Sequence, residues 1–413
     1  MKKSFLLIST NYHPEPTATG KYNGELIEWL VKNGHDCTVI SMYPHYPYWK
    51  VMLPYKNRWF KKETKRFSTE SGLLTVYRCP AFIPRVPTGK NRLVQETSFY
   101  IAALFVVINL LFKKKIDYAI GVAPPFHTVI LARFYRFFKG SKVIYHIQDL
   151  QVDTAQELGM LKNKMLFNVL YKLEKRQFQK AAFVSSISDG MIKKIKTKVD
   201  REVIFFPNWV DTTAFYPLPG REQLKRKWGY ADDDIVCLYS GGIGEKQGLE
   251  VILHAAKILQ ENRKFKFIIC GFGQYKETLE KLAAELQLDN LDFLPLQDKA
   301  VFNEFLNMGD LHMVIQKSKA SELALPSKLT TILSVGGVSV VTAFSGTSLH
   351  SLVTDFNVGF ACDPDNPAEL AKTLQGIEGE CLDEKRKNAN AYAQNYINIQ
   401  NVMMRFLDQI SAA

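Results

Sequence analysis

Cysteine is scarce in this sequence and follows no metal-binding pattern. Six of the 413 residues are cysteine, and none forms a C-x-x-C pair. Cys37, Cys237 and Cys270 fall inside apolar runs that are typical of buried strands. This usage argues against a disulfide framework and against a structural zinc site. We therefore predict packed free thiols in a reducing compartment.

A long apolar run is also missing. A membrane-spanning helix needs about 20 apolar residues, whereas residues 99–112 form a shorter run that Asn109 interrupts and three lysines follow. We interpret this run as a buried core helix, with a helix lying in a membrane interface as the alternative. Residues 4–9 follow two lysines but precede no small-residue cleavage site, so they are interpreted as the first strand and not as a signal peptide.

Acidic residues are outnumbered by basic ones. The chain has 53 Lys and Arg against 41 Asp and Glu, a formal net charge of +12. An excess of this size indicates an anionic partner: nucleic acid, a phosphorylated ligand or an anionic membrane surface. Basic and aromatic residues are interleaved in residues 55–66, where the basic patch comprises Arg58, Lys61, Lys62, Lys65 and Arg66. A solvated face is the ordinary explanation of such a run, and a membrane-facing patch is the alternative. No recognisable nucleic-acid module accompanies it, so nucleic acid is not expected as a partner.

Strand and helix patterns alternate through both halves of the chain. This alternation predicts parallel sheets, and 413 residues are too many for one compact core. We predict an α/β fold of two Rossmann-like, doubly wound domains that face a cleft. The proline-containing stretch 203–217 ends one strand system before another begins, which places the domains at 1–205 and 206–385. Residues 386–413 are predicted to form a helical segment that packs back on the first domain.

The sequence contains no G-x-x-x-x-G-K-[ST] motif, yet two glycine loops follow predicted strands. The first, "YSGGIGEKQG", contains Gly242 and Lys246, and the second, "IICGFGQ", contains Gly273. Glycines let a backbone approach a ligand closely, and a helix that begins after such a loop presents free N–H groups to an anion. Two such loops in one domain favour a phosphate-bearing ligand, with plain strand-to-helix turns as the alternative.

A third stretch, "SELALPSKLTTILSVGG", places charge beside a predicted helix start. Pro326 and Ser327 can begin a helix, which puts Glu322 before it and Lys328 in its first turn. A lysine there opposes the helix dipole, so an anionic ligand would explain its presence. A solvated lysine is the alternative.

The first half supplies two further residues at strand ends. Gly20 follows the first predicted strand and precedes a helix, and His146 ends the strand pattern "KVIYHIQD". A histidine in this position suits acid/base chemistry or hydrogen bonding to a ligand, and a structural role is the alternative.

Taken together, these motifs resemble the GT-B glycosyltransferases of family 4 over essentially the whole chain. The matching features are the Gly20 loop with "ELIEWLVKNGHDCTVIS", the "PNWVD" stretch, "YSGGIGEKQGLEVILHAA", "CGFG" and "LPSKLTTILSVGG". Within that family the chain is most similar to bacterial polysaccharide enzymes of the colanic-acid fucosyltransferase and O-antigen L-fucosamine transferase kind.

The resemblance implies roles for individual residues. Lys246 matches the lysine that binds the donor diphosphate, and Gly20 matches the loop that lies against it. Glu322 corresponds to a glutamate that contacts the donor sugar, and His146 to a histidine near the reacting sugar. Gly242, Gly273, Ser327 and Lys328 complete the implied donor site.

Two positions depart from the family pattern. The arginine that usually precedes the phosphate lysine is absent, and Thr331 stands where a second glutamate is expected. Lys328 is positioned in the sequence to replace part of that phosphate or ribose recognition.

The implied activity is transfer of a sugar, such as fucose or L-fucosamine, from a UDP- or GDP-linked donor to a polyprenyl-diphosphate-linked saccharide in bacterial surface polysaccharide synthesis. The resemblance implies retention at the anomeric carbon and a cytoplasmic enzyme bound peripherally to the inner membrane face. No D-x-D motif with metal-ligand character stands out, so neither metal nor cofactor is expected. The alternatives are a nucleotide-sugar 2-epimerase of the same fold and a non-catalytic nucleotide-sugar-binding subunit.

Overall fold

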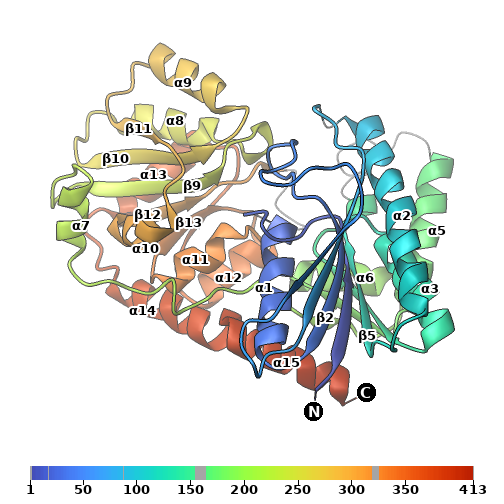
Figure 1. Cartoon of the computed structure of the whole chain (residues 1–413). Helices are drawn as coiled ribbons and strands as arrows, with labels where there is room; N and C mark the ends of the chain where they lie inside the picture. The colour runs from blue at the N-terminus through green and yellow to red at the C-terminus, as the bar shows by residue number, and fades with distance from the viewer. Residues whose placement is uncertain (1, 17, 87, 154–163, 319–324, 413) are drawn as a thin grey trace. The chain divides into compact units, whose positions relative to one another are not determined.

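The computed structural model describes residues 2–16, 18–86, 88–153, 164–318 and 325–412. The chain divides into two compact units (Figure 1). The N-terminal unit comprises Met1–Phe206 and Phe406–Ala413, and the C-terminal unit comprises Pro207–Arg405. Each is an α/β unit built on a largely parallel sheet, which confirms the predicted fold class.

The sheet of the N-terminal unit has the strand order β3-β4-β2-β1-β5-β6-β7-β8. All neighbours in it are parallel except the edge pair β3 and β4. Its strands are β1 Ser4–Ile8, β2 Asp36–Met42, β3 Lys61–Lys65, β4 Leu74–Cys79, β5 Tyr118–Ala123, β6 Lys142–Ile147, β7 Phe183–Ser186 and β8 Ile204–Phe205. The central strands read as nearly continuous apolar runs because helices cover both faces of such a sheet.

The helices of this unit lie in two layers. They are α1 Ala18–Lys32, α2 Gly89–Leu111, α3 Thr128–Lys139, α5 Lys164–Lys180 and α6 Asp189–Lys198. Helices α2, α3 and α5 lie side by side against one face of the sheet (Figure 1). We refer to these three as the α2–α3–α5 layer.

The sheet of the C-terminal unit is parallel throughout, in the order β11-β10-β9-β12-β13-β14. Its strands are β9 Ile235–Gly242, β10 Phe265–Phe272, β11 Leu291–Leu294, β12 Leu311–Val314, β13 Val338–Thr342 and β14 Gly359–Cys362. Its helices are α7 Arg221–Lys227, α8 Glu250–Ile258, α9 Lys276–Glu285, α10 Lys299–Met308, α11 Lys328–Ser334, α12 Ser348–Asp355, α13 Pro367–Ile377 and α14 Asp383–Tyr392. A short 3₁₀ helix, η1 Glu245–Gln247, follows β9.

The C-terminal segment is helical and contributes to both units. A π-helical turn, η3 Ala393–Ile397, follows α14, and α15 Ile399–Ser411 comes next. Residues up to Arg405 belong to the C-terminal unit, and those from Phe406 onward belong to the N-terminal unit. In the N-terminal unit Phe406 stacks on Phe206 with ring centroids 4.0 Å apart, and the Tyr118 hydroxyl donates to the Ile410 carbonyl at 3.2 Å.

All six cysteines are free thiols, and only Cys381 is exposed. Cys37, Cys237 and Cys270 lie in β2, β9 and β10 and are buried, as the sequence predicted. Burial raises the pKa of each of these three thiols above its usual value. They therefore act as small apolar core groups rather than as reactive thiolates.

Candidate functional site

The strand order of the C-terminal unit reverses between β9 and β12. The chain continues from β9 to its neighbour β10 on one side, whereas β12 arrives on the other side from later in the sequence. In open α/β sheets, ligands bind outside the carboxyl ends of the strands at such a point. β9 ends there in the first glycine loop, and α11 follows β12 and begins with Lys328.

The glycines of the two loops serve two different purposes. A Cβ on Gly271, in β10, would lie 1.8 Å from the Gly241 carbonyl oxygen, and one on Gly273, directly after β10, would lie 1.8 Å from the Ile243 carbonyl oxygen. These two glycines let the neighbouring strand ends pack together. A Cβ on Gly242, by contrast, would meet no atom within 4 Å. The predicted donor-binding position Gly242 therefore borders open space, while Gly273 supports the backbone beside it.

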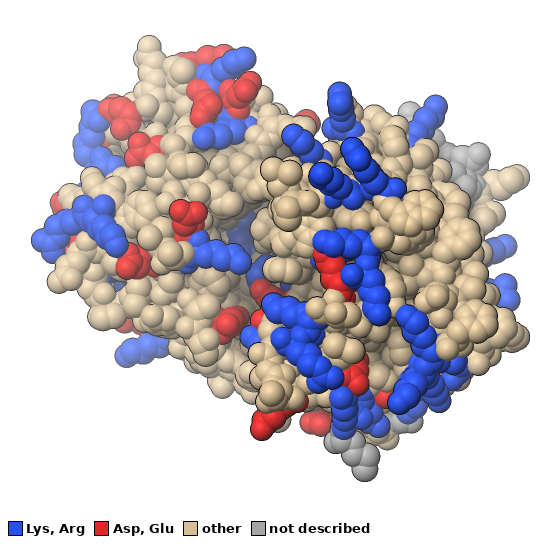
Figure 2. All heavy atoms as spheres, viewed as in Figure 1, with Lys and Arg blue, Asp and Glu red and all other residues tan. Residues whose placement is uncertain are grey.

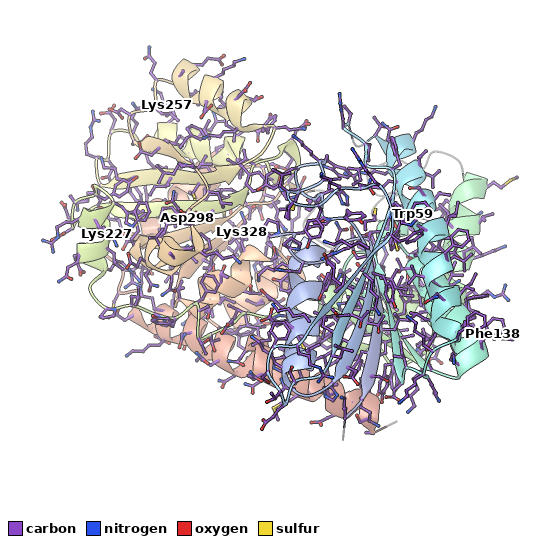
Figure 3. All side chains as sticks on the ribbon, viewed as in Figure 1. Trp59, Phe138, Lys227, Lys257, Asp298 and Lys328 are labelled. Atoms are coloured by element: carbon purple, nitrogen blue, oxygen red, sulfur yellow. The ribbon has the colours of Figure 1, made fainter. Side chains whose placement is uncertain are left out.

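Lys328 brings a cation to this loop. Lys328 is labelled in Figure 3. Its Nζ lies 3.3 Å from the centroid of the Tyr239 ring and would lie 3.0 Å from a Cβ on Gly241. Tyr239 is held in place because its hydroxyl donates to the Gly242 carbonyl at 2.7 Å. The lysine thus crosses from α11 to the end of β9.

The Lys328 ammonium group is buried and has no hydrogen-bond partner among the described residues. A cation over an aromatic face gains part of its lost solvation back, but none of its three N–H donors is satisfied by that contact. Burial lowers the pKa of Lys328 well below its usual value. An anion placed at the Gly242 loop would supply the missing acceptors and would restore the charged form.

The other residues of this unit that the sequence assigns to the donor site are only partly described. Lys246 has its backbone in η1, but its side chain lies outside the described residues, as does the whole of Glu322. Ser327 is exposed before α11, and its side chain makes no capping hydrogen bond. Thr331 donates its hydroxyl to the Lys328 carbonyl at 2.9 Å, so that hydroxyl is engaged within its own helix. The implied roles of these residues remain predictions.

Gly20 of the N-terminal unit packs against a buried carboxylate. A Cβ on Gly20 would lie 2.6 Å from Oε2 of Glu15, so no larger residue fits there without displacing Glu15. Glu15 accepts hydrogen bonds from the backbone N–H groups of His45 and Tyr46, each at 2.9 Å, and from the Asn11 amide at 2.8 Å. Burial raises the pKa of the Glu15 carboxyl, against the lowering effects of His45 and these hydrogen bonds. Glu15 therefore joins the loops that follow β1 and β2, a role that the sequence analysis missed.

His146 lies inside the core at the end of β6. Its Nδ1 is 3.0 Å from the Ser185 hydroxyl, and its Nε2 is 3.0 Å from the Gln148 amide nitrogen. Burial lowers the pKa of His146 to about 3, so the ring is neutral at physiological pH. Both ring nitrogens are engaged, and the imidazole packs edge to face with the Phe206 ring, with ring centroids 5.1 Å apart. This geometry favours the structural role that the sequence left open beside the catalytic one.

The basic patch falls on the edge of the sheet in the N-terminal unit. Lys61–Lys65 form the edge strand β3, which the sequence analysis did not predict, and all five patch residues are exposed. Side chains alternate across a strand, so Lys61 and Lys65 lie on one face and Lys62 on the other. Lys61 also pairs with Glu63 at 2.9 Å. The patch is therefore divided rather than continuous, and basic side chains are spread widely over the face of this unit seen in Figure 2.

The apolar run of the sequence is the centre of α2. This is the one helix among the described residues that is long and apolar enough to cross a membrane, and 39% of its most apolar window is buried. Its inner face, including Phe99, Ala103 and Val107, belongs to the core. Its outer face exposes Ile101 and Phe105 by more than half of each side chain. The core-helix interpretation is thus correct for one face only.

The described residues contain no group of three or more His, Cys, Asp or Glu side chains arranged to hold a metal ion. The expectation that the reaction needs no metal remains a prediction from the sequence.

Comparison with known proteins gives the same class as the fold. The family described as "Glycosyl transferases group 1" matches residues 220–396, which include the Gly242 loop and Lys328. The putative colanic acid biosynthesis glycosyl transferase WcaI of Escherichia coli (strain K12) is 35% identical over 98% of this chain and 99% of that protein. The probable glycosyltransferase WbjE of Pseudomonas aeruginosa is 23% identical over 80% of this chain and 84% of that protein.

Solved structures show the same architecture at low sequence identity. Sucrose-phosphate synthase from Thermosynechococcus elongatus superposes with a TM-score of 0.77 at 14% identity, with both chains covered completely. Anabaena Alr3699/HepE in complex with UDP and glucose gives a TM-score of 0.70 at 13% identity, again over both whole chains. WaaG, a glycosyltransferase involved in lipopolysaccharide biosynthesis, superposes with a TM-score of 0.68 at 13% identity, over 99% of this chain and 100% of that chain.

The fold is therefore that of the GT-B enzymes. The chain belongs to the group 1 glycosyltransferases, and it is a glycosyltransferase enzyme.

Proposed function

We propose that this enzyme transfers a sugar from a nucleoside-diphosphate donor to a lipid-linked saccharide during the synthesis of a bacterial surface polysaccharide. The Escherichia coli relative is named for colanic acid biosynthesis, and WaaG for lipopolysaccharide biosynthesis. Both names support a polysaccharide product. The donor sugar we propose is a deoxysugar such as fucose or L-fucosamine, linked to UDP or GDP, transferred with retention and without a metal ion.

One observation carries the donor site: the Lys328 side-chain nitrogen beside the Gly242 loop is buried and has no partner in the part of the chain that the structure describes. Sugar transfer breaks the bond between the anomeric carbon and the diphosphate, and negative charge develops on the departing diphosphate. Donors fixed in place before that charge appears stabilise it most effectively. In our proposal Lys328 binds a diphosphate oxygen and the backbone around Gly242 lies against the same group.

The remaining contacts of the donor site are carried over from the sequence. Lys246 would bind the diphosphate together with Lys328, and Glu322 would contact the donor sugar. Ser327 and Gly273 would belong to the same donor-binding site, and the Gly20 loop would lie against the donor phosphates. His146 would then support the loop near the reacting sugar through its ring hydrogen bonds rather than exchange protons.

The proposed acceptor is a polyprenyl-diphosphate-linked saccharide at the inner face of the cytoplasmic membrane, to which the enzyme binds peripherally. The exposed apolar face of α2 and the basic residues of the N-terminal unit support this part of the proposal. Basic residues near an anionic bilayer each contribute about 1 kcal/mol to binding.

The test is a comparison of the Lys328→Met variant with a matched Lys281→Met variant, in which an exposed lysine of the same unit is removed. Binding of UDP, GDP and a panel of their sugars is measured by thermal shift, because a ligand of the folded state raises its stability. We expect Lys328→Met to lose the shift while Lys281→Met retains it.

Turnover tests the reaction itself. Release of nucleoside diphosphate that requires a lipid-linked acceptor supports transfer. Formation of an epimer without acceptor would replace the proposal with epimerisation. Unchanged donor binding and turnover in Lys328→Met would overturn the donor site.

A further inference from the structure

The outer surface of the α2–α3–α5 layer is unusual in charge. The three helices contain ten lysine or arginine residues and only two glutamates, Glu96 and Glu174. Glu174 is buried and pairs with Lys198, and Glu96 accepts a hydrogen bond from the Gln151 amide at 3.3 Å. Of the basic residues of the layer, Arg92 interacts electrostatically with Glu96, so two carboxylates leave most of the ten positive charges uncompensated within these helices.

The same surface exposes large apolar side chains. Phe137 and Phe138 of α3 are 82% and 57% exposed, and Phe105 of α2 is 63% exposed. Further exposed apolar residues of these helices are Leu93, Val94, Ile101, Ile108, Met165, Val169 and Leu173. A patch that combines apolar and basic side chains on a helical surface is typical of contact with a membrane interface.

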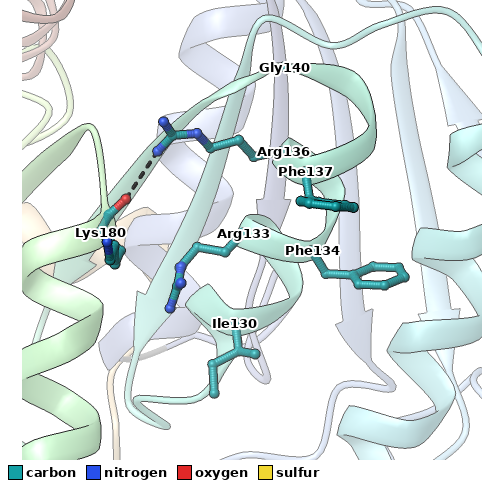
Figure 4. Close-up of a pocket in the computed structure, with 7 residues that line it drawn as sticks. All are labelled: Ile130, Arg133, Phe134, Arg136, Phe137, Gly140 and Lys180. Carbon is teal, nitrogen blue, oxygen red and sulfur yellow. Dashed lines mark hydrogen bonds between the residues drawn. The ribbon is translucent and has the colours of Figure 1, made fainter.

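Within this surface lies a pocket of about 590 Å³ between α3 and the end of α5 (Figure 4). Helical spacing brings Ile130, Arg133, Phe134 and Phe137 to one side of α3, because residues three and four apart are neighbours. Arg136, Gly140 and Lys180 complete the lining.

The pocket is cationic and contains no acidic partner. Arg133 donates to the Gln177 side chain at 2.6 Å, and Arg136 donates to the Lys180 carbonyl at 3.1 Å. These neutral acceptors orient the guanidinium groups without compensating their charge. Burial and the neighbouring cations Arg176 and Arg136 lower the pKa of Arg133. Among the described residues, none of the three basic lining residues forms an ion pair.

We propose that the pocket between α3 and α5 binds the phosphate headgroup of an anionic phospholipid while Phe137 and Phe138 enter the bilayer interface beside it. Guanidinium groups bind phosphate oxygens with well-defined geometry, and the exposed phenylalanines match the acyl boundary. This inference rests on the proposed action at a membrane. It gives that membrane contact a specific place, distinct from the divided basic patch on β3.

The lipid source is favoured over a soluble phosphate because the cations and the exposed aromatic side chains share one surface. A soluble anion would use Arg133 and Arg136 but would leave the phenylalanines in water. The two sources therefore differ in what they require, and an experiment can separate them.

The experiment measures co-sedimentation of the full chain with vesicles of phosphatidylglycerol and phosphatidylcholine, and with vesicles of phosphatidylcholine alone. The Arg133→Gln/Arg136→Gln variant is compared with Lys257→Gln/Lys281→Gln, which removes the same charge from the C-terminal unit. We expect the pocket variant to bind anionic vesicles about tenfold more weakly or worse, and the control to bind as the unaltered chain does.

Two further variants keep the proposal testable if the first folds poorly. Arg133→Lys/Arg136→Lys keeps the charge and should bind better than the glutamine pair. Phe137→Ser/Phe138→Ser replaces exposed side chains and should also weaken vesicle binding. Anionic-vesicle binding that survives in both the glutamine pair and the serine pair would overturn the proposal.

Other results of the vesicle experiment would identify a different ligand. Cross-controls with the donor-site variant separate this site from the donor site. Displacement from vesicles by millimolar inorganic phosphate would indicate a soluble anion as the ligand, and equal binding to both vesicle types would remove the headgroup contact. The pocket variants should retain the thermal shift with nucleotide sugars, whereas Lys328→Met should retain vesicle binding. Failure of one proposal thus leaves the other standing.

Discussion

The two units share one architecture but distribute charge in opposite ways. The N-terminal unit contains 33 Lys and Arg against 16 Asp and Glu, a formal net charge of +17. The C-terminal unit contains 20 Lys and Arg against 25 Asp and Glu, a formal net charge of −5. This is nevertheless the unit that carries the site proposed for an anionic donor. The whole positive excess of the chain therefore lies in the unit that does not hold Lys328.

This difference distinguishes two ways of binding an anion. In the C-terminal unit the buried Lys328 amino group has no acceptor among the described residues, so in our proposal the anion is recognised at short range in a site of low dielectric constant. The N-terminal unit has many exposed cations, which attract an extended anionic surface over distances up to the Debye screening length. The net charge of a unit thus indicates whether its surface attracts an extended anionic partner. A single buried basic group without an acceptor indicates instead that a small anion binds at that place.

The largest expected contrast is in sensitivity to salt. Between 50 and 500 mM NaCl we expect affinity for anionic vesicles to fall about 100-fold, because exposed charges are screened. Donor affinity should change less than about threefold, because the Lys328 ammonium is shielded from solvent. Vesicle co-sedimentation and nucleotide-sugar titrations in the same buffers measure both. If vesicle affinity and donor affinity fell equally with salt, the two units would not differ in how they bind anions.

The next effect is on the stability of the ligand-free protein. Lys328→Met removes a buried amino group that has no acceptor among the described residues, so we expect the ligand-free variant to be more stable by about 1–3 kcal/mol. Replacing the exposed Lys281 should change stability by less than about 0.5 kcal/mol. Urea unfolding without donor measures the difference. A destabilised Lys328→Met protein would show that this ammonium group is satisfied in the absence of donor.

A third effect is the pH dependence of donor binding. The pKa of Lys328 is lowered in the free protein, and a bound diphosphate would raise it, so binding takes up a proton. Donor affinity should therefore fall as the pH rises above the lowered pKa, by at most about tenfold per pH unit. Calorimetry in buffers of different ionisation enthalpy measures the proton uptake, and Lys328→Met should abolish it.

The smallest expected contrast is in sensitivity to acid, where the two units should behave alike. Each contains a buried neutral histidine, His146 or His312, whose pKa is lowered to about 3 by burial; Arg221 and Arg386 contribute for His312. In the unfolded chain each histidine binds a proton near pH 6.5, whereas in the folded protein it does so only near pH 3. The stability that each neutral histidine contributes is therefore complete above pH 6.5 and is lost as the pH falls from 6.5 toward 3. At pH 5.5 each histidine should lower the free energy of unfolding by about 1.4 kcal/mol relative to neutral pH.

Urea unfolding at pH 7.5 and 5.5 measures that loss, and NMR of the histidine rings assigns it. A His146 ring that titrates near pH 6.5 would contradict the buried geometry and would return the residue to acid/base chemistry.

Much of the fold could be predicted because buried parallel strands have a plain signature. The apolar runs of β1, β9 and β10 are continuous, and a glycine turn follows each of the last two. The edge strand β3 was missed because its sequence, "KKETK", is charged throughout. Only pairing with β4 makes it a strand, and the paired residues run from Lys61 with Arg78 to Lys65 with Leu74, across a connection that the local sequence does not reveal.

The candidate site could be predicted only in outline. The loop glycines and Lys328 were identified from their places after strands, but the contact between Lys328 and Tyr239 joins residues almost 90 positions apart. Tyr239 carried one signal, since it lies two positions before the first glycine of its loop. Glu15 carried none, because its importance comes from two backbone N–H groups on a different strand connection.

The division of α15 between the units has a consequence for synthesis on the ribosome. Phe406 and Ile410 are buried in the N-terminal unit, so that unit lacks part of its core until the chain beyond Arg405 has been translated. The C-terminal unit consists of one uninterrupted segment and is complete earlier. The half of the protein that is made first therefore obtains the last part of its core only from the final residues of α15.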